Sequence, residues 1–132
     1  MTGEPPLDAL RARLAASRAA LLHALEGITE REFAAELEAG RSVVRALAEL
    51  AAAERADVSR ARGADEPIRV PEKPLPPQVI HDLAGARYRT ETIVATPGGV
   101  PAGALAGLVE GIAVREEAMA ARIEALKPTA HR

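Results

Sequence analysis

Residues 42–63, SVVRALAELAAAERADVSRARG, contain the clearest helical pattern in the chain. Ser42 is a residue type that favours the N-cap of a helix, and Gly63 favours the end of one. The apolar side chains recur at helical spacing and share one face: Val43, Leu47, Leu50 and Val58. Glu54 falls on the same face, and Glu49 borders it. The stretch therefore predicts an amphipathic helix that packs against other helices and carries a carboxylate inward.

Three further stretches, residues 6–27, 77–95 and 102–126, show the same periodicity. Prolines fill the segment between the second and third helices, at residues 63–77, and forbid a regular helix there. Four amphipathic helices in a chain of 132 residues predict an all-α fold, a four-helix bundle that forms a single domain over residues 1–132.

Each of these helices has an apolar stripe, and the first one also carries several cations. Its stripe consists of Leu7, Leu10, Leu14, Leu21 and Leu25. Arg11, Arg13 and Arg18 fall off this stripe, so we expect them on a solvated face. After the first helix, Thr29 and Glu32 have the spacing of a capping box, which favours a short helical turn.

Composition excludes several classes of function. Seventeen Lys and Arg against nineteen Asp and Glu give a net charge of -2, which argues against a nucleic-acid partner. The absence of cysteine removes disulfides, thiolate nucleophiles and cysteine-based zinc sites. No apolar run approaches the ~20 residues that a membrane-spanning helix needs. We therefore expect a cytoplasmic domain with no membrane partner.

Charged residues on inward faces are the main candidates for a site. The third helix is expected to turn inward Ile80, Leu83, Arg87 and Val94, with Glu91 four residues after Arg87. In the fourth helix, Arg115 and Glu116 interrupt an otherwise continuous apolar stripe. The residues that could line a pocket are Glu54, Arg87, Glu91 and Glu116.

Three interpretations of these inward charges stay open. They pair with each other or reach the end of the bundle, because a buried charge is costly unless it is paired. Alternatively, Glu49, Glu54 and Glu116 hold a divalent ion, although nearby arginines compete for the same oxygens. In the third interpretation, the charges line a pocket for a small-molecule ligand.

Residues 21–63, LLHALEGITEREFAAELEAGRSVVRALAELAAAERADVSRARG, resemble the first half of a DinB-like (DinB/YfiT) domain. Members of that superfamily have a leucine-rich helix, a Gly-x-Trp-Ser-Val motif that opens helix two, and then Leu-x-His-Leu. Residues 113–126, AVREEAMAARIEAL, are more loosely similar to the last helix of the family. The resemblance implies a four-helix bundle in up-down-down-up order, often dimeric, with a divalent metal held by one His on helix two and two on helix four.

This chain departs from the family at the metal ligands. The matching positions hold Glu49 in place of the helix-two His, and Arg115 and Met119 in place of the helix-four pair. Arginine does not ligate, and methionine is a poor ligand for the ions in question. The resemblance therefore implies that the three-histidine site is missing, unless a shift of one residue in helix four brings in Glu116 as part of a carboxylate site.

We therefore expect no cofactor and a binding or structural relative of the family rather than an enzyme. The alternative is a divalent-metal-dependent hydrolase or a thiol-dependent transferase with a remodelled carboxylate site. Two further expectations concern assembly and the missing site. The wide apolar stripes of the first and last helices predict a homodimer. Glu49 and Arg115, which have opposite charges, are expected to pair where the metal would otherwise link the helices.

Overall fold

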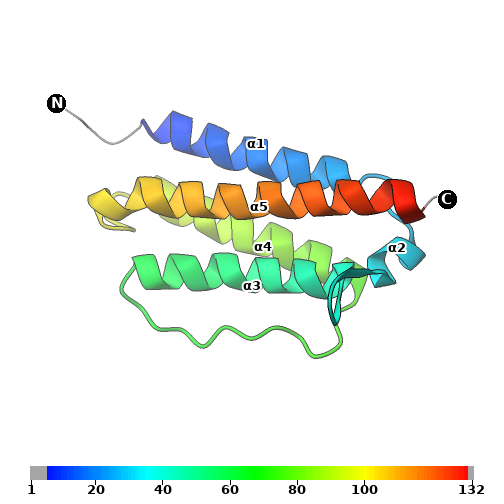
Figure 1. Cartoon of the computed structure of the whole chain (residues 1–132). Coiled ribbons are helices and arrows are strands. Elements are labelled where there is room, and N and C mark those ends of the chain that lie inside the picture. Colours follow the sequence, from blue (N-terminus) through cyan, green and yellow to red (C-terminus); the bar gives the residue numbers. More distant parts are fainter. Residues whose placement is uncertain (1–5, 131–132) are drawn as a thin grey trace.

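Four long helices make up most of residues 6–130, the part of the chain that the computed structural model describes (Figure 1). They are α1 (Leu7–Leu25), α3 (Val43–Ala61), α4 (Pro76–Ala95) and α5 (Ala102–Ala130). Between α1 and α3 lie the short helix α2 (Glu30–Ala34) and two short antiparallel strands, β1 (Glu36–Glu38) and β2 (Arg41–Ser42). The prediction of an all-α chain is confirmed, but the small β-hairpin was not predicted.

The local signals in the sequence set most of the helix ends. The Ser42 hydroxyl accepts a hydrogen bond from the backbone N–H of Arg45 at 3.2 Å, which caps α3. Thr29 and Glu32 form the expected capping box at the start of α2. Gly63 has a positive φ of 76°, which ends the helical path after α3. Only α5 differs clearly, because it extends four residues beyond the expected end at residue 126.

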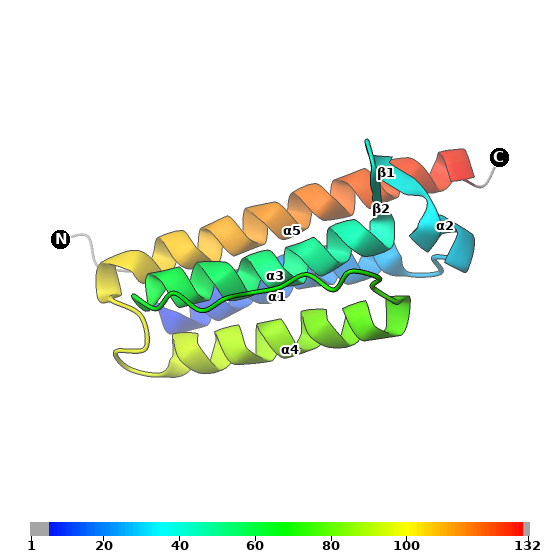
Figure 2. The same ribbon diagram turned by 90° about the horizontal axis from the view of Figure 1, so that it is seen from below.

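The four long helices lie side by side in two parallel pairs (Figures 1 and 2). Helices α1 and α5 run in one direction, and α3 and α4 run in the other. Residues 62–75 travel back along α3 without regular structure, which lets α4 start at the same end as α3. Helix α1 packs mainly on α5, α3 packs mainly on α4, and contacts between α3 and α5 join the two pairs.

Ion pairs reinforce the contact between α1 and α5. The Arg13 guanidinium lies 3.0 Å from Glu110 and 2.6 Å from Glu117, both on α5. Hydrogen bonds from Arg13 hold the pKa of both carboxyls below its usual value. Because these groups are exposed to solvent, we regard the pairs as an aid to helix register rather than as a large source of stability.

The apolar core consists of two clusters rather than one. The first lies near the α2 end and includes Leu21, Leu47, Leu83 and Ile123. The second lies near the opposite end and includes Leu10, Leu14, Val58, Val94 and Ile112. On each long helix, a short stretch with buried polar residues separates the members of the two clusters.

Most of the predicted apolar faces are buried, and the inward face of α4 differs from the prediction only at its first apolar position. Val79 is fully buried, whereas Ile80, which was expected to point inward, is 39% exposed. Leu83 and Val94 are buried as predicted. None of the helices within residues 6–130 is both long and apolar enough to cross a membrane.

From the core we predict that two leucine-to-alanine substitutions differ strongly in their effect on the free energy of unfolding. Leu47→Ala, in the first cluster, is expected to lower the free energy of unfolding by about 2–5 kcal/mol because it leaves a cavity. Leu75→Ala, at a position that is 63% exposed, is the matched control and should cost less than about 1 kcal/mol. Urea unfolding followed by circular dichroism measures both. Equal losses would contradict this assignment of the core.

Candidate functional site

A network of charged and hydroxyl side chains lies in the middle of the molecule, between the two apolar clusters. Each long helix contributes to it. We call it the buried ion network, and it consists of Ser17 and Arg18 from α1, Glu54 from α3, Arg87 and Thr90 from α4, and Glu116 from α5. Glu54, Arg87 and Glu116 are 3%, 5% and 1% exposed, so water screens these charges little.

Arg87 is the centre of the network. Its Nε lies 3.1 Å from Glu54 Oε2, and its Nη2 lies 2.6 Å from Glu116 Oε1. Its Nη1 donates to the carbonyl oxygen of Leu14 at 2.9 Å. One guanidinium on α4 thus contacts groups on α1, α3 and α5.

Arg18 contacts the second carboxylate oxygen of Glu116, and two hydroxyls donate to oxygens that Arg87 already contacts. Arg18 Nε lies 2.7 Å from Glu116 Oε2, and Arg18 Nη1 donates to the carbonyl oxygen of Leu83 at 3.1 Å. The hydroxyls of Ser17 and Thr90 lie 2.6 Å from Glu116 Oε1 and Glu54 Oε2, respectively. Arg18 Nη2 makes no hydrogen bond to another residue within 6–130, but it lies 3.5 Å from Glu54 Oε1.

The charges of the buried ion network balance, because two arginines face two glutamates. Burial acts to lower the pKa of Arg87. The charge of Glu54 and the hydrogen bonds to Glu116 and Glu54 outweigh burial, so the pKa lies above its ordinary value. Arg87 is therefore charged at neutral pH, and all four carboxylate oxygens of the two glutamates have a cationic or hydroxyl neighbour.

The residues expected to carry inward charges differ in their burial. Glu54, Arg87 and Glu116 are buried and pair with each other, as the first interpretation expected. Glu91 is exposed, because α4 turns Thr90 inward instead. Arg18 was expected on a solvated face, but its long side chain curls into the interior, where it is 13% exposed.

Two members of the network, Ser17 and Thr90, were missed. Both continue an inward face at helical spacing, since Ser17 lies three residues after Leu14 and Thr90 lies three residues after Arg87. A small hydroxyl residue on an apolar stripe, at the level of an inward carboxylate, was the signal that could have revealed them.

Glu49, Arg115 and Met119, the positions at which the resemblance implied metal ligands, lie at one place. They border a hollow of about 190 Å³ between α3 and α5, beside the β-hairpin. We call it the α3–α5 hollow. Glu38 and Arg122 also line it. The hollow lies at the surface, and the side chains of Glu49 and Arg115 are 32% and 44% exposed.

The expected pair between Glu49 and Arg115 does not form. Glu49 lies 3.5 Å from Arg41 and 3.6 Å from Arg45. Arg115 instead lies 2.6 Å from Asp57, two turns further along α3. Both side chains are partly exposed to solvent, so each of these ion pairs is expected to contribute little to stability.

The residues present do not fit a metal ion at either place. Within residues 6–130, no group of three or more His, Cys, Asp or Glu side chains could hold one. Glu54 and Glu116 give their oxygens to arginines and hydroxyls, and Glu49 belongs to separate ion pairs at the surface. The set of three carboxylates considered as a divalent-ion site is therefore not brought together.

Removal of one charge from the buried ion network should be costly. Arg87→Met is expected to lower the free energy of unfolding by about 3–5 kcal/mol, because Glu54 and Glu116 then lack their main partner. The matched control is Arg89→Met on the same helix, which removes an exposed ion pair with Glu66 and should cost less than about 1 kcal/mol.

The double variant Glu54→Leu/Arg87→Met tests whether the two residues are coupled, whatever the loss of stability in each single variant. Its loss should be smaller than the sum of the two single losses by more than about 1 kcal/mol, because the second substitution removes a charge that the first left unpaired. Urea unfolding measures the native chain, Glu54→Leu, Arg87→Met, the double variant and Arg89→Met. Additive losses, or equal losses at positions 87 and 89, would show that the network is not coupled.

The chain was compared with family models, with curated proteins and with solved structures, and none of them matches it. What the molecule does is therefore inferred from its own contacts, above all from the buried ion network and the α3–α5 hollow.

Proposed function

We propose that the chain is a DinB-like four-helix-bundle protein that has no metal site and acts by binding rather than by catalysis. In this proposal the buried ion network, rather than a metal ion, links the helices. The single observation that carries the proposal is the occupation of the interior carboxylates, because Arg87, Arg18 and two hydroxyls surround the oxygens of Glu54 and Glu116.

Two further observations support the DinB-like part of the proposal. The directions of α1, α3, α4 and α5 are those of an up-down-down-up bundle, and the long segment 62–75 supplies the crossover (Figures 1 and 2). The resemblance matches Glu49 on α3 and Arg115 and Met119 on α5 with metal ligands, and all three border the same hollow.

Metal content tests the proposal directly. Protein purified without a histidine tag should carry less than about 0.1 equivalent of Mn, Ni, Zn or Mg after dialysis, because arginine and methionine replace ligands. Elemental analysis measures this ratio. A near-stoichiometric metal that survives dialysis would favour the metal-dependent enzyme instead.

A matched variant tests the alignment itself. The triple variant Glu49→His, Arg115→His and Met119→His places His at the three aligned positions. It should take up about one Zn or Ni ion per chain and melt at a higher temperature when the metal is added. If the triple variant binds no more metal than the native chain, the three positions do not converge as a ligand set, and the DinB-like alignment fails.

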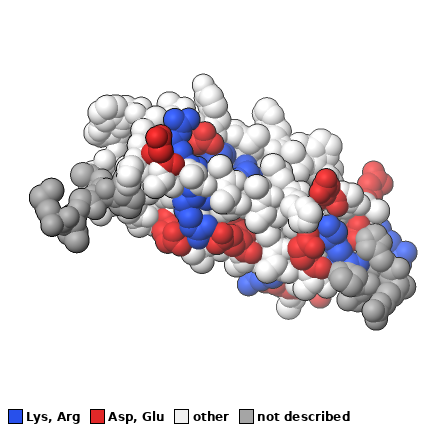
Figure 3. All heavy atoms as spheres, turned by 90° about the horizontal axis from the view of Figure 1, so that it is seen from above, with Lys and Arg blue, Asp and Glu red and all other residues white. Residues whose placement is uncertain are grey.

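The proposal includes a homodimer formed through α1 and α5. These helices expose the large apolar side chains of Leu7, Leu22 and Val114, which are 39%, 53% and 52% exposed. Figure 3 shows that the face on the α1 side is mostly uncharged, with its charges gathered in a few groups. Apolar side chains that lie between such groups of charges support association of two copies.

Light scattering tests the dimer. At tens of micromolar, the native chain should give about twice its chain mass of 13.8 kDa. Leu22→Glu and Val114→Glu should each shift the mass toward 13.8 kDa, because they place a charge in the apolar contact. Tyr88→Glu is the control, since Tyr88 is 77% exposed but lies on α4. A monomeric native chain would contradict the proposal.

A further inference from the structure

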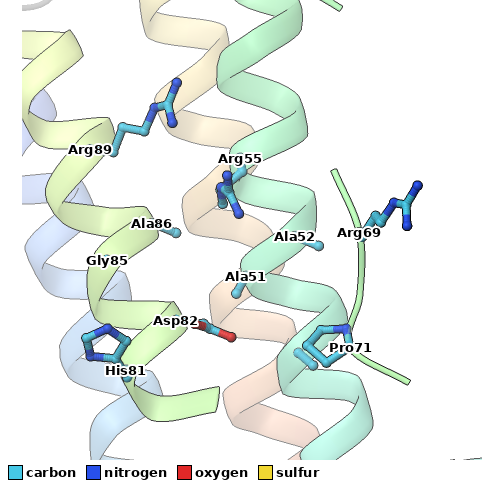
Figure 4. A pocket seen from close by; sticks show the side chains of 11 residues that line it. Ala51, Ala52, Arg55, Arg69, Pro71, His81, Asp82, Gly85, Ala86 and Arg89 are labelled. Carbon is cyan, nitrogen blue, oxygen red and sulfur yellow. The ribbon is translucent and has the colours of Figure 1, made fainter. Parts of the chain in front are cut away.

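A groove of about 420 Å³ lies between α3 and α4, on the side where residues 62–75 cross (Figure 4). We call it the α3–α4 groove. Its walls carry only small side chains where the two helices face each other, namely Ala48, Ala51, Ala52, Gly85 and Ala86. Because these residues fill little space, the groove has room for the apolar body of a small molecule.

Arginines from three different segments border this groove. Arg55 comes from α3, Arg89 from α4 and Arg69 from the crossing segment (Figure 4). With Asp82 as the only acidic side chain among the lining residues, the formal charge of the lining is +2 with His81 neutral, whereas the whole chain carries -2. The groove is therefore a local positive site on a chain that is slightly acidic overall.

Two of the three arginines are free to contact a ligand. Neither Arg55 nor Arg69 makes an ion pair or a side-chain hydrogen bond with another residue in the described part of the chain. Arg89 pairs with Glu66 at 3.0 Å, and both groups are partly exposed. In Figure 4 the side chains of Arg55 and Arg89 lie over the groove from the two helices, and that of Arg69 extends outward from the crossing segment.

The crossing segment is held in place on both sides of Arg69. The backbone N–H of Glu66 donates to the Ser59 hydroxyl at 3.2 Å, which ties the segment to α3. Further along, Arg45 donates to the carbonyl oxygens of Pro71 and Glu72 at 3.0 and 3.1 Å. These contacts fix the outer wall of the groove, so its shape does not depend on a ligand.

We propose that the α3–α4 groove binds a small organic anion. The apolar body of the ligand lies on the alanine and glycine walls, and its carboxylate or phosphate group contacts Arg55 and Arg89. A guanidinium donates two hydrogen bonds to such an oxyanion, which gives both affinity and orientation. This inference supplies a ligand class for the proposed binding role, but it depends on different residues from those tested by metal content.

Titration of the full chain with four probes tests the inference, with amide chemical shifts as the readout. Phenyl phosphate or benzoate should bind saturably at the α3–α4 groove, and the tighter of the two identifies the head group. Inorganic phosphate, which lacks the apolar body, should bind at least about tenfold more weakly, and benzylamine should not bind. If neither aromatic anion shifts amides of α3 and α4, the inference is wrong.

Two variants separate a built site from general charge attraction. Arg55→Gln should weaken binding at least about tenfold, because it removes a charged hydrogen-bond donor. Arg11→Gln removes the same charge from α1 and should change the affinity less than about twofold. Equal weakening by the two variants would overturn the inference.

Gly85→Leu blocks the groove without removing a charge. A Cβ at Gly85 meets no atom within 4 Å, and leucine favours a helix more than glycine does, so this variant should melt no lower than the native chain. It should nevertheless lose binding of the aromatic anion. Native affinity in the folded Gly85→Leu variant would place the ligand elsewhere. If the metal measurement contradicts the proposed function, these binding experiments can still be interpreted, because none of them involves the α3–α5 hollow.

Discussion

The neutrality of the buried ion network is the constraint on which the rest of the structure depends. Arg87 cannot be buried without Glu54 and Glu116, and Glu116 needs Arg18 as well. Such a network adds little net stability over apolar side chains of the same volume, because desolvation offsets attraction. Its effect is on specificity. A slide or rotation of any one long helix would leave a buried charge without its partner, so the network fixes the register of all four helices together.

This constraint matters more in this protein because its apolar packing does little to fix the register of the helices. The core is divided into two clusters, and many of its buried residues are alanines, which offer little shape to interlock. The same small residues let α3 and α4 lie beside each other without filling the outer side of their contact. The α3–α4 groove therefore follows from the alanine-rich composition, and the polar network compensates for the loss of shape in the interior.

Sequence periodicity was enough to predict the four long helices, the caps at Ser42 and Thr29, and the burial of Glu54, Arg87 and Glu116. It was not enough for residues at the edges of a helical face. Ile80 and Arg18 lie there, where a rotation of a few tens of degrees decides between interior and solvent. Pairing was harder still, because it depends on distances between helices that no local pattern contains. Arg115 thus contacts Asp57 rather than Glu49.

The absence of a Glu49–Arg115 pair also shows where an ion pair can fix the helices of this bundle. An ion pair at the exposed α3–α5 hollow would be screened by water and would hold the helices weakly. Glu54 lies about one turn further along α3 and is shielded from water. Because its charge is screened little there, it holds the charged side chains that contact it in fixed positions. A metal can cross-link helices at a partly exposed site because its coordination bonds are strong. Salt bridges can do so only where the interior excludes solvent, and that is why the four helices of this chain meet around Arg87.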